Sequence, residues 1–428
     1  MEEVFVQGAT DAVLMAWNTM DMRNKREKSR YDPGFVIEGI DLSGITFIDD
    51  IVEFARTAEE MFERLIDDEV FQRSNRLKFK PSKCKILLIN ADAGTFRKFY
   101  QLNNEAVEVV LKWKYLGTLV DHQGRTFDFE DRMKGANSVA NEIVQICKSD
   151  DLSSMRLKYV NLLIEACLHG KLKYGCEFWA ILCEKDEESL DNIQVKVLKR
   201  VLEVPYATPS AAVKYEFGII DLSLVIKLEK VLLAVKTLQS EDERKAKQLL
   251  KIMLEKKVPG FATEVLQISS NIFGTDLNEL VQLEGDLRTI LKKKVIDLQR
   301  SKLMKQMLML SKADHLLLHS FSFDGKRKRY LDLPFHLARV VFMVRCRMLP
   351  TKENFPGRWN GTCCNVCGNT DTEEHLFTCP GFADLLDDTV SLELFFSVEE
   401  LDVLESAAEK MVKVVARLNV LQERSSDE

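Results

Sequence analysis

The apolar residues near the start of the chain form short runs of the kind found in strands. Ile45 to Ile48 and Ile51 to Phe54 are rich in β-branched and aromatic residues, and Asp49 and Asp50 stand between them. This pattern predicts two short strands joined by a turn, with both carboxylates at the tip of the hairpin. Further strands are predicted from Ile86 to Ile89 and from Trp113 to Val120.

From about residue 130 onward, the apolar residues recur every three or four positions, which predicts helices. The clearest stretches are 155–167, 287–298 and 401–418. Pro205 and Pro209 interrupt the pattern, so a bent linker is predicted there. The apolar stripe of 401–418 must be covered, either by the cysteine-rich segment that precedes it or by a partner helix.

Two spacings of the form Ser/Thr-x-x-Glu predict where helices begin, because both side chains of such a capping box bond free backbone amides. One is Thr57 with Glu60, and the other is Ser397 with Glu400. A helix is also predicted after Gln7-Gly8, so a turn before that helix is one interpretation of the pair.

The size and composition predict a folded protein of several parts. The chain has 428 residues, of which 46% are hydrophobic and 30% charged, which is enough for buried cores and more than one domain usually contains. The predicted fold class is α+β: a mixed α/β part at 1–125, a mainly helical part at 126–312 and a small cysteine-rich module at 313–428. The apolar runs are far shorter than the roughly 20 residues that cross a bilayer. With no secretory pattern at the start, we expect an intracellular protein, nuclear or cytoplasmic, that is neither secreted nor membrane-bound.

Ten cysteines in a chain of this length are too few and too scattered for a disulfide scaffold, so most are expected to be reduced. Cys364, Cys367, His375 and Cys379 differ from the others, because they follow a C-x2-C and H-x3-C pattern. Three thiolates and an imidazole are typical ligands of structural zinc (Zn2+), with no position left open for catalysis. Cys363 is the alternative first ligand.

The positive charge is concentrated before this cysteine pattern. The chain has a net charge of −7, yet residues 326–358 hold nine basic and two acidic residues, a net +7. Lys326, Arg327, Lys328 and Arg329 open this run, and Trp359 follows it. Phosphate contacts with an aromatic ring for base stacking are one interpretation, and a solvated helical face is the other. Residues 369–428, with fifteen acidic and four basic residues, should be repelled by nucleic acid.

Several of these motifs follow one another in an order that resembles a known family. In order they are Gln7-Gly8, Phe47-Ile48-Asp49-Asp50, Asn75 to Leu87, Trp113 to Gly117, Lys173 to Trp179, Val204 to Gly218 and the Cys/His pattern that ends at Cys379. Together they resemble the second half of the reverse transcriptase of non-LTR retrotransposons, from a partial palm through the thumb to a zinc knuckle.

The resemblance implies roles for individual residues. Asp49 and Asp50 would hold catalytic magnesium (Mg2+), with RNA or DNA as the partner. Gln7, Gly8 and Lys83 would contact the nucleotide and template, although a basic strand edge is another interpretation of Lys83. Tyr115, Leu116 and Gly117 would form the primer grip, a hairpin in which Gly117 permits the turn and Tyr115 packs inward.

The sequence also departs from the family pattern. A reverse transcriptase has fingers and a further metal-binding aspartate before the Gln-Gly motif, whereas six residues precede Gln7 here, and Ala12-Val13 stands where Ser-Pro is usual. The spacing of Asp41 and Asp67 does not recommend either as a replacement. Polymerisation by this chain alone is therefore expected to be negligible, and a non-catalytic, nucleic-acid-binding zinc protein is the alternative function.

Overall fold

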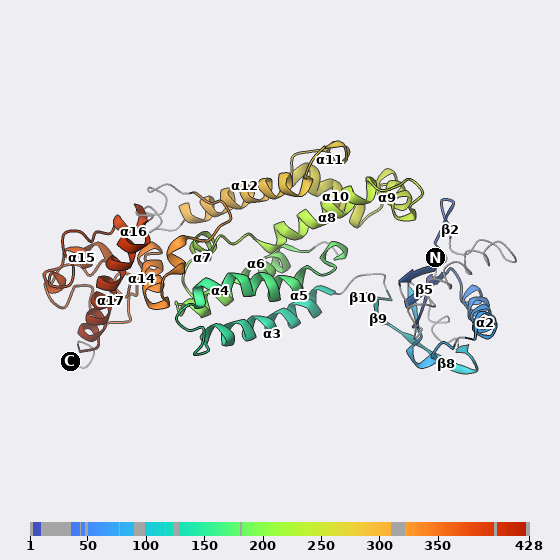
Figure 1. Ribbon diagram of the computed structural model, residues 1–428, viewed down its shortest axis with the longest axis horizontal. Helices are drawn as coiled ribbons and strands as arrows, with labels where there is room; N and C mark the ends of the chain where they lie inside the picture. Colours follow the sequence, from blue (N-terminus) through green and yellow to red (C-terminus); the bar gives the residue numbers. More distant parts are fainter. Residues whose placement is uncertain are drawn as a thin grey trace. The chain divides into compact units, whose positions relative to one another are not determined.

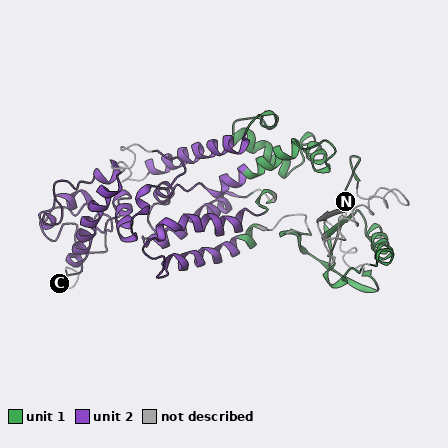
Figure 2. Cartoon of the chain, in the orientation of Figure 1, with its two compact units in different colours: residues 1–132, 175–182, 229–285 green, residues 133–174, 183–228, 286–428 purple. Residues whose placement is uncertain are grey.

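The computed structural model describes residues 3–9, 36–42, 44–47, 50–76, 78–89, 99–115, 117–122, 128–179, 182–309, 322–397 and 400–424. The fold is α+β. Unit 1 contains residues 1–132, 175–182 and 229–285, and unit 2 contains residues 133–174, 183–228 and 286–428 (Figure 2). The predicted boundaries near 125 and 312 fall in the gaps 123–127 and 310–321, outside the described residues, and stay a prediction.

The centre of unit 1 is a six-stranded sheet with the order β4-β5-β1-β6-β8-β7. Its strands are β1 (Glu3–Ala9), β4 (Gly44–Phe47), β5 (Asp50–Ala55), β6 (Lys85–Ile89), β7 (Tyr100–Leu102) and β8 (Glu105–Val110). β1 runs antiparallel to both β5 and β6, and β6 runs parallel to β8. Met61 and Leu65 of helix α2 (Ala58–Asn75) belong to the same buried apolar cluster as Ile86 and Leu88 of β6, and α2 contacts β5 and β7.

The sequence predicts a hairpin in this sheet and a cap at the start of α2. β4 and β5 form an antiparallel pair that ends at Phe47 and Asp50, which confirms the two predicted strands. Asp50 is the first residue of β5, and Ile48 and Asp49, where the turn is predicted, lie outside the described residues. The Thr57 hydroxyl accepts a hydrogen bond from the Glu60 amide at 3.2 Å, as expected of a cap. The return bond to the Glu60 carboxylate comes from the Arg56 amide at 2.7 Å, one residue before the donor that a capping box predicts.

Unit 1 also contains two small hairpins and several short helices. These elements are β2 (Val36–Ile37) with β3 (Ile40–Asp41), β9 (Lys112–Tyr115) with β10 (Thr118–Asp121), η1 (Pro81–Lys83), η4 (Cys176–Phe178), α9 (Lys245–Glu255), α10 (Phe261–Gln267), η5 (Ile268–Ile272) and α11 (Leu277–Gln282). The ammonium group of Lys230, whose side chain is 2% exposed, donates to the Glu264 carboxylate at 2.6 Å and to the Trp179 carbonyl at 2.8 Å. This buried cation ties segments that are distant in sequence.

Helices dominate unit 2, as the spacing of apolar residues predicts. They are α3 (Asp128–Lys148), α4 (Arg156–Leu163), η3 (Ile164–His169), α5 (Gly170–Lys173), α6 (Glu184–Leu202), α7 (Ser210–Phe217), α8 (Leu222–Leu238), α12 (Leu287–Leu308), η6 (Arg329–Asp332), α14 (Phe335–Arg345), α15 (Glu373–Thr378), η7 (Pro380–Phe382), α16 (Leu394–Ser397) and α17 (Leu401–Arg424), with α3 and α8 beginning or ending in unit 1. Pro205 and Pro209 lie between α6 and α7, which confirms the predicted break. No described helix is long and apolar enough to cross a bilayer.

The apolar stripe of the last helix is covered within the chain. Leu404, Ala408, Met411 and Leu418 are buried, and α17 packs against α14 (Figure 1). α17 also contacts the cysteine-rich segment that precedes it, since the Asn365 amide group donates to the Leu421 carbonyl at 3.0 Å. The predicted cap at Ser397 is wrong, because Ser397 ends α16 and its hydroxyl donates backward to the Glu393 carbonyl.

Candidate metal centre

A tight reversal of the chain positions the first two cysteines of the C-x2-C pattern. The Cys364 amide donates to the Asn369 carbonyl at 2.7 Å, and the Gly368 amide donates to the Cys364 carbonyl at 3.0 Å. Gly368 has a φ of +76°, a left-handed conformation that costs glycine little because it lacks a Cβ atom. The reversal turns both Cys364 and Cys367 toward α15.

The short helix α15 and the residue after it supply the other two donors. Thr372 caps this helix, since its hydroxyl accepts a hydrogen bond from the His375 amide at 3.1 Å. Cys379 follows the last turn of the helix. The cap fixes the start of α15, and therefore fixes the position from which the imidazole of His375 extends.

The four donor atoms lie close enough together to hold one metal ion. The Sγ and imidazole nitrogen atoms of Cys364, Cys367, His375 and Cys379 all lie within 4.8 Å of one another. The Cys379 sulfur is 3.8 Å from the sulfurs of both Cys364 and Cys367, and the Cys367 sulfur is 3.1 Å from His375 Nε2. Cys363, the alternative first ligand, is exposed and lies outside this group.

Burial makes this group a poor place for unbound thiolates. Cys364 and Cys379 are 6% and 2% exposed, and burial raises the pKa of the Cys379 thiol to about 12. The pKa of Cys367 is lowered instead, because the Asn369 amide donates to its sulfur. A bound cation would favour the deprotonated form of all three thiols, since metal binding and thiol ionisation are coupled.

Buried carboxylates connect the segment that holds the four donors, here called the metal group, to the rest of unit 2. Asp371 Oδ2 accepts from the Lys352 amide at 2.9 Å and from the Gln422 side chain of α17 at 3.2 Å. Glu373 is fully buried and lies 3.3 Å from Arg347 Nε, and burial raises its pKa to about 7. Both acids lie between Cys367 and His375 in sequence, so the geometry of the four donors depends on these contacts.

The sheet of unit 1 brings two of the sequence motifs onto adjacent strands. Asp50 is the first residue of β5 and pairs with Ala9 of β1, and the next pair along the strands is Gly8 with Ile51. Gln7 and Gly8 therefore lie inside a strand, and their interpretation as a turn before a helix is wrong. Asp49 and the predicted helix after Gly8 lie outside the described residues, and the side chains of Asp50 and Gln7 are not described either.

The other residues predicted to contact nucleotide or primer lie in separate elements. Lys83 is exposed and is the last residue of η1, and strand β6 begins only at Lys85. Its interpretation as part of a strand edge is therefore wrong. Tyr115 ends β9 and pairs with Thr118 of β10, and Gly117 has a φ of +83°. The predicted hairpin with a turn at Gly117 is confirmed, while Leu116 lies outside the described residues.

The basic run at 326–358 is used largely for contacts within the chain. Arg327 donates to the Leu157 carbonyl at 3.2 Å and pairs with Asp332, and the Lys328 ammonium lies 4.5 Å from the ring centre of Tyr215. Lys326 and Arg329 are exposed. Further basic residues that contact acidic or carbonyl oxygens are Arg339, Arg345, Arg347 and Lys352. The charge count therefore overstates what this run presents to a partner.

The aromatic residue after the basic run has a partner of its own. Phe355 to Arg358 form a tight turn, in which the Arg358 amide donates to the Phe355 carbonyl at 3.1 Å and Gly357 has a φ of +84°. The Arg358 guanidinium lies 4.6 Å from the ring centre of Trp359. A base that stacks on this ring would have to share it with Arg358.

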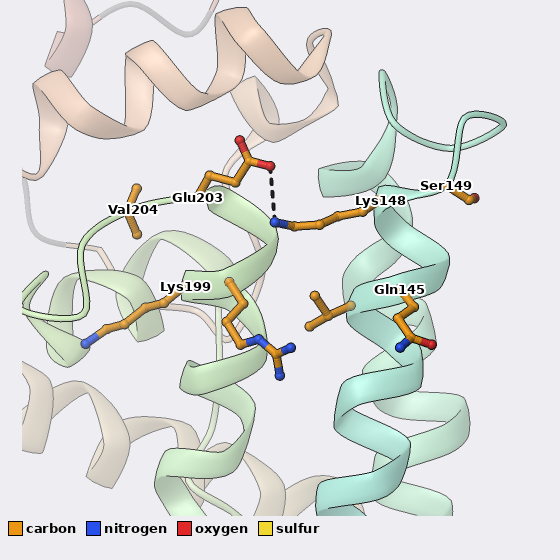
Figure 3. Close-up of a pocket in the computed structure, with 8 residues that line it drawn as sticks. Gln145, Lys148, Ser149, Lys199, Glu203 and Val204 are labelled. Carbon is orange, nitrogen blue, oxygen red and sulfur yellow. Dashed lines mark ion pairs between the residues drawn. The ribbon is translucent and has the colours of Figure 1, made fainter.

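Unit 2 also contains a groove of about 600 Å³, which the sequence patterns do not indicate (Figure 3). It lies between the C-terminal turns of α3 and α6. Its lining residues are Val144, Gln145, Lys148, Ser149, Lys199, Arg200, Glu203 and Val204. The Lys148 ammonium lies 3.2 Å from the Glu203 carboxylate and so connects the two helices.

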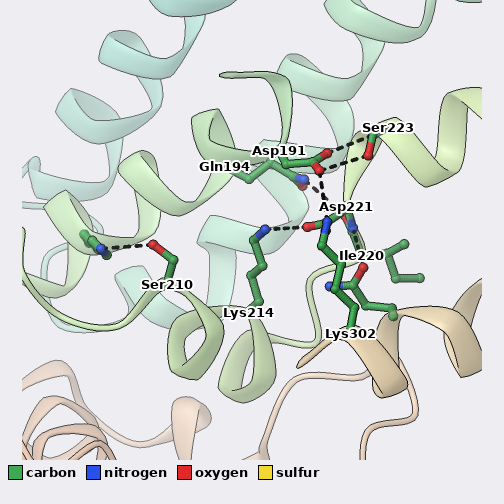
Figure 4. A network of polar contacts seen from close by, with 10 residues as sticks. Asp191, Gln194, Ser210, Lys214, Ile220, Asp221, Ser223 and Lys302 are labelled. Carbon is green, nitrogen blue, oxygen red and sulfur yellow. Dashed lines mark hydrogen bonds and ion pairs between the residues drawn. The ribbon is translucent and has the colours of Figure 1, made fainter. Parts of the chain in front are cut away.

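A buried network of charges holds four helices of unit 2 together (Figure 4). Asp221 is fully buried and accepts from Lys214 at 2.5 Å and from Lys302 at 2.6 Å. Asp191 accepts from the Ser223 amide and hydroxyl, each at 2.9 Å. Burial, and secondarily the charge of Asp221, raises the pKa of Asp191 to about 6. The available sequence signal was the position of Asp191, which interrupts the apolar face of α6 beside buried Leu190.

Comparisons of the chain with protein-family models and with curated protein sequences found no match.

Proposed function

We propose that the chain is a polypeptide derived from a retrotransposon reverse transcriptase, which binds RNA or DNA and does not copy it unaided. The observation that supports this most is the register of β1 and β5. It pairs Gly8 of the Gln-Gly motif with the residue that follows Asp50. Motifs that are well separated in sequence thus lie at the same end of two adjacent strands, which a polymerase palm requires of its metal-binding and nucleotide-binding positions.

The chemistry of such a palm depends on carboxylates that converge on metal. Asp49 and Asp50 would hold magnesium, which stabilises the charge that develops on the transferred phosphoryl group. The family pattern places a further metal-binding aspartate upstream of the Gln-Gly motif. Without such an aspartate the magnesium would lack a ligand, and several kcal/mol of transition-state stabilisation would be lost.

Primer extension on an RNA template tests this proposal. We expect the purified 428-residue chain, with magnesium and nucleotides, to bind the primer–template without extending the primer. The control is the double variant Asp49→Asn, Asp50→Asn. Extension by the parent chain that the double variant loses would show that another group replaces the missing aspartate, and would contradict the proposed lack of activity.

We further propose that the metal held by Cys364, Cys367, His375 and Cys379 is zinc. A tetrahedral zinc ion with Zn–S bonds of about 2.3 Å separates its sulfur ligands by about 3.8 Å. The two sulfur distances from Cys379 are both 3.8 Å, whereas Cys367 and His375, at 3.1 Å, would have to move slightly apart. Four protein ligands make the zinc structural.

This zinc group favours a second candidate function, a nucleic-acid-binding zinc protein without catalysis. The donors of the zinc group converge in the structure, and they need no part of the palm to do so. In this case the sheet of unit 1 would serve only as a scaffold. Both candidate functions predict nucleic-acid binding without primer extension, so extension by the parent chain would contradict both of them.

A further inference from the structure

We propose that the groove between α3 and α6 binds phosphate groups of a nucleic-acid strand, which makes it a phosphate-binding site of the proposed function. The inference rests on that function for the identity of the ligand. It rests on the groove itself for the chemistry, since the groove combines an open volume of about 600 Å³ with a local excess of positive charge.

The charges of the residues that line the groove are unbalanced. Lys148, Lys199 and Arg200 line it, and Glu203 is the one acidic residue among the lining residues. Behind the groove, Arg156 lies 3.2 Å from the same Glu203 carboxylate. The Arg156 side chain is 6% exposed, and its Nε has no hydrogen-bond partner among the described residues. One carboxylate therefore faces several cations, in a chain whose net charge is −7.

The end of α6 does not oppose an anion as strongly as a free helix C-terminus would. Arg339 donates to the carbonyl of Leu202 at 3.1 Å and to that of Glu203 at 3.0 Å. The Val204 amide donates to the Lys199 carbonyl at 3.2 Å. These bonds occupy the carbonyl groups of Lys199, Leu202 and Glu203 and so reduce the partial negative charge that the end of α6 presents.

Two exposed cationic side chains can exchange their present partners for a ligand. Lys148 and Glu203 are 39% and 45% exposed, and an ion pair this exposed contributes little to stability. A phosphate can therefore replace Glu203 as the partner of Lys148 at small cost. Arg200 is exposed and donates to the Asn141 side chain at 2.5 Å. Its planar guanidinium group can also bind two phosphate oxygens at once.

The ammonium group of Lys199 plays a different part. It donates to the Tyr206 carbonyl at 2.9 Å and to the Ser210 hydroxyl at 3.3 Å. These bonds hold it in place, so it adds positive charge near the groove without contacting the ligand directly. Lys148 and Arg200 are therefore the residues to change in an experiment.

The test compares the full zinc-loaded chain with variants, using fluorescent single-stranded RNA and, separately, inorganic pyrophosphate as probes. Lys148→Gln and Arg200→Gln each remove one exposed charge and should weaken RNA binding by roughly tenfold. Each should also reduce the slope of log affinity against log salt concentration by the amount expected for about one phosphate contact. Glu203→Gln should strengthen binding. Lys413→Gln, an equal loss of charge at an exposed position of α17, is the control and should change little.

The outcomes separate the inference from the proposed function. If the parent chain binds RNA and both groove variants bind it as the Lys413 variant does, the inference is overturned while the proposed function stands. If the groove variants lose pyrophosphate binding alone, the phosphate site stands but a nucleic-acid strand is not its ligand. If the parent chain binds neither probe, both proposals fail. Thermal unfolding of each variant confirms that its fold is retained.

Discussion

Replacing Cys364 with serine is expected to release the proposed zinc ion and to unfold the segment around residues 362–382, whereas replacing its neighbour Cys363 should leave both unchanged. Binding of structural zinc is worth about 10–16 kcal/mol in small zinc-dependent domains, and it is coupled to their folding. Cys364 is buried and within reach of the other three donors, while Cys363 is exposed and outside the group. The two adjacent cysteines thus form a matched pair of variants.

Metal analysis of the purified variants, together with hydrogen exchange, measures both parts of this prediction. The parent chain and the Cys363→Ser variant should each carry about one zinc ion, as expected for a closed four-ligand site. Cys364→Ser and His375→Ala should lose it and exchange rapidly between residues 362 and 382. A structural zinc site would be ruled out if the parent chain carried no metal and residues 362–382 were protected from hydrogen exchange to the same degree in the parent and in the ligand variants.

The effect of zinc loss should extend beyond the ligands. Asp371 accepts hydrogen bonds from the Lys352 amide and from Gln422 of α17, and the Gln422 side chain also donates to the Pro350 carbonyl at 2.9 Å. When residues 364–379 lose their fixed geometry, these partners lose their acceptor. We therefore expect faster amide hydrogen exchange at the end of α17 as well, and a smaller effect at its start near Leu404.

Replacing Asp221 with asparagine is expected to destabilise unit 2 by about 3–5 kcal/mol, the usual cost of removing one partner from a buried ion pair. Asp221 is fully buried, and its first partner, Lys214, has a side chain that is 6% exposed. Without the carboxylate, the ammonium group of Lys214 would remain in a site that excludes water. Lys302, the second partner, is 45% exposed and can turn toward solvent.

Urea unfolding at neutral pH measures this prediction, with Lys302→Met as the matched control. That variant removes one cationic partner of the Asp221 carboxylate and leaves Lys214 to neutralise it. It should therefore lower the free energy of unfolding by about 1 kcal/mol or less. The double variant Lys214→Met, Asp221→Asn removes the stranded cation and should recover part of the loss. Equal destabilisation by Asp221→Asn and Lys302→Met would contradict the dominant role of the buried pair.

Features set by neighbouring residues could be predicted from the sequence. The β4–β5 hairpin follows from two apolar runs around a pair of aspartates, and the metal group follows from cysteine spacing and the turn at Gly368. The strand that contains Gln7 and Gly8 could not be predicted in this way, because its pairing with β5 and β6 depends on residues distant in sequence.

Charge patterns were the least reliable guide, because they do not show where a side chain finds its partner. Arg327 bonds the carbonyl of Leu157, and Arg345 pairs with buried Glu216 at 3.0 Å. Neither partner is a neighbour in sequence. The groove between α3 and α6 was missed for the same reason, since Lys148 and Arg200 belong to different helices. The spacing of Ser397 to Glu400 predicts a cap, although the Ser397 hydroxyl donates backward to the Glu393 carbonyl.

The salt dependence of nucleic-acid binding tests the central claim most directly. Affinity of the zinc-loaded 428-residue chain for a primer–template would be measured from low to high salt. The account predicts that the logarithm of affinity falls linearly with the logarithm of salt concentration, by about 0.7–0.9 for each phosphate contact. Absence of binding at low salt, or an affinity that salt does not change, would contradict the claim that this chain binds nucleic acid.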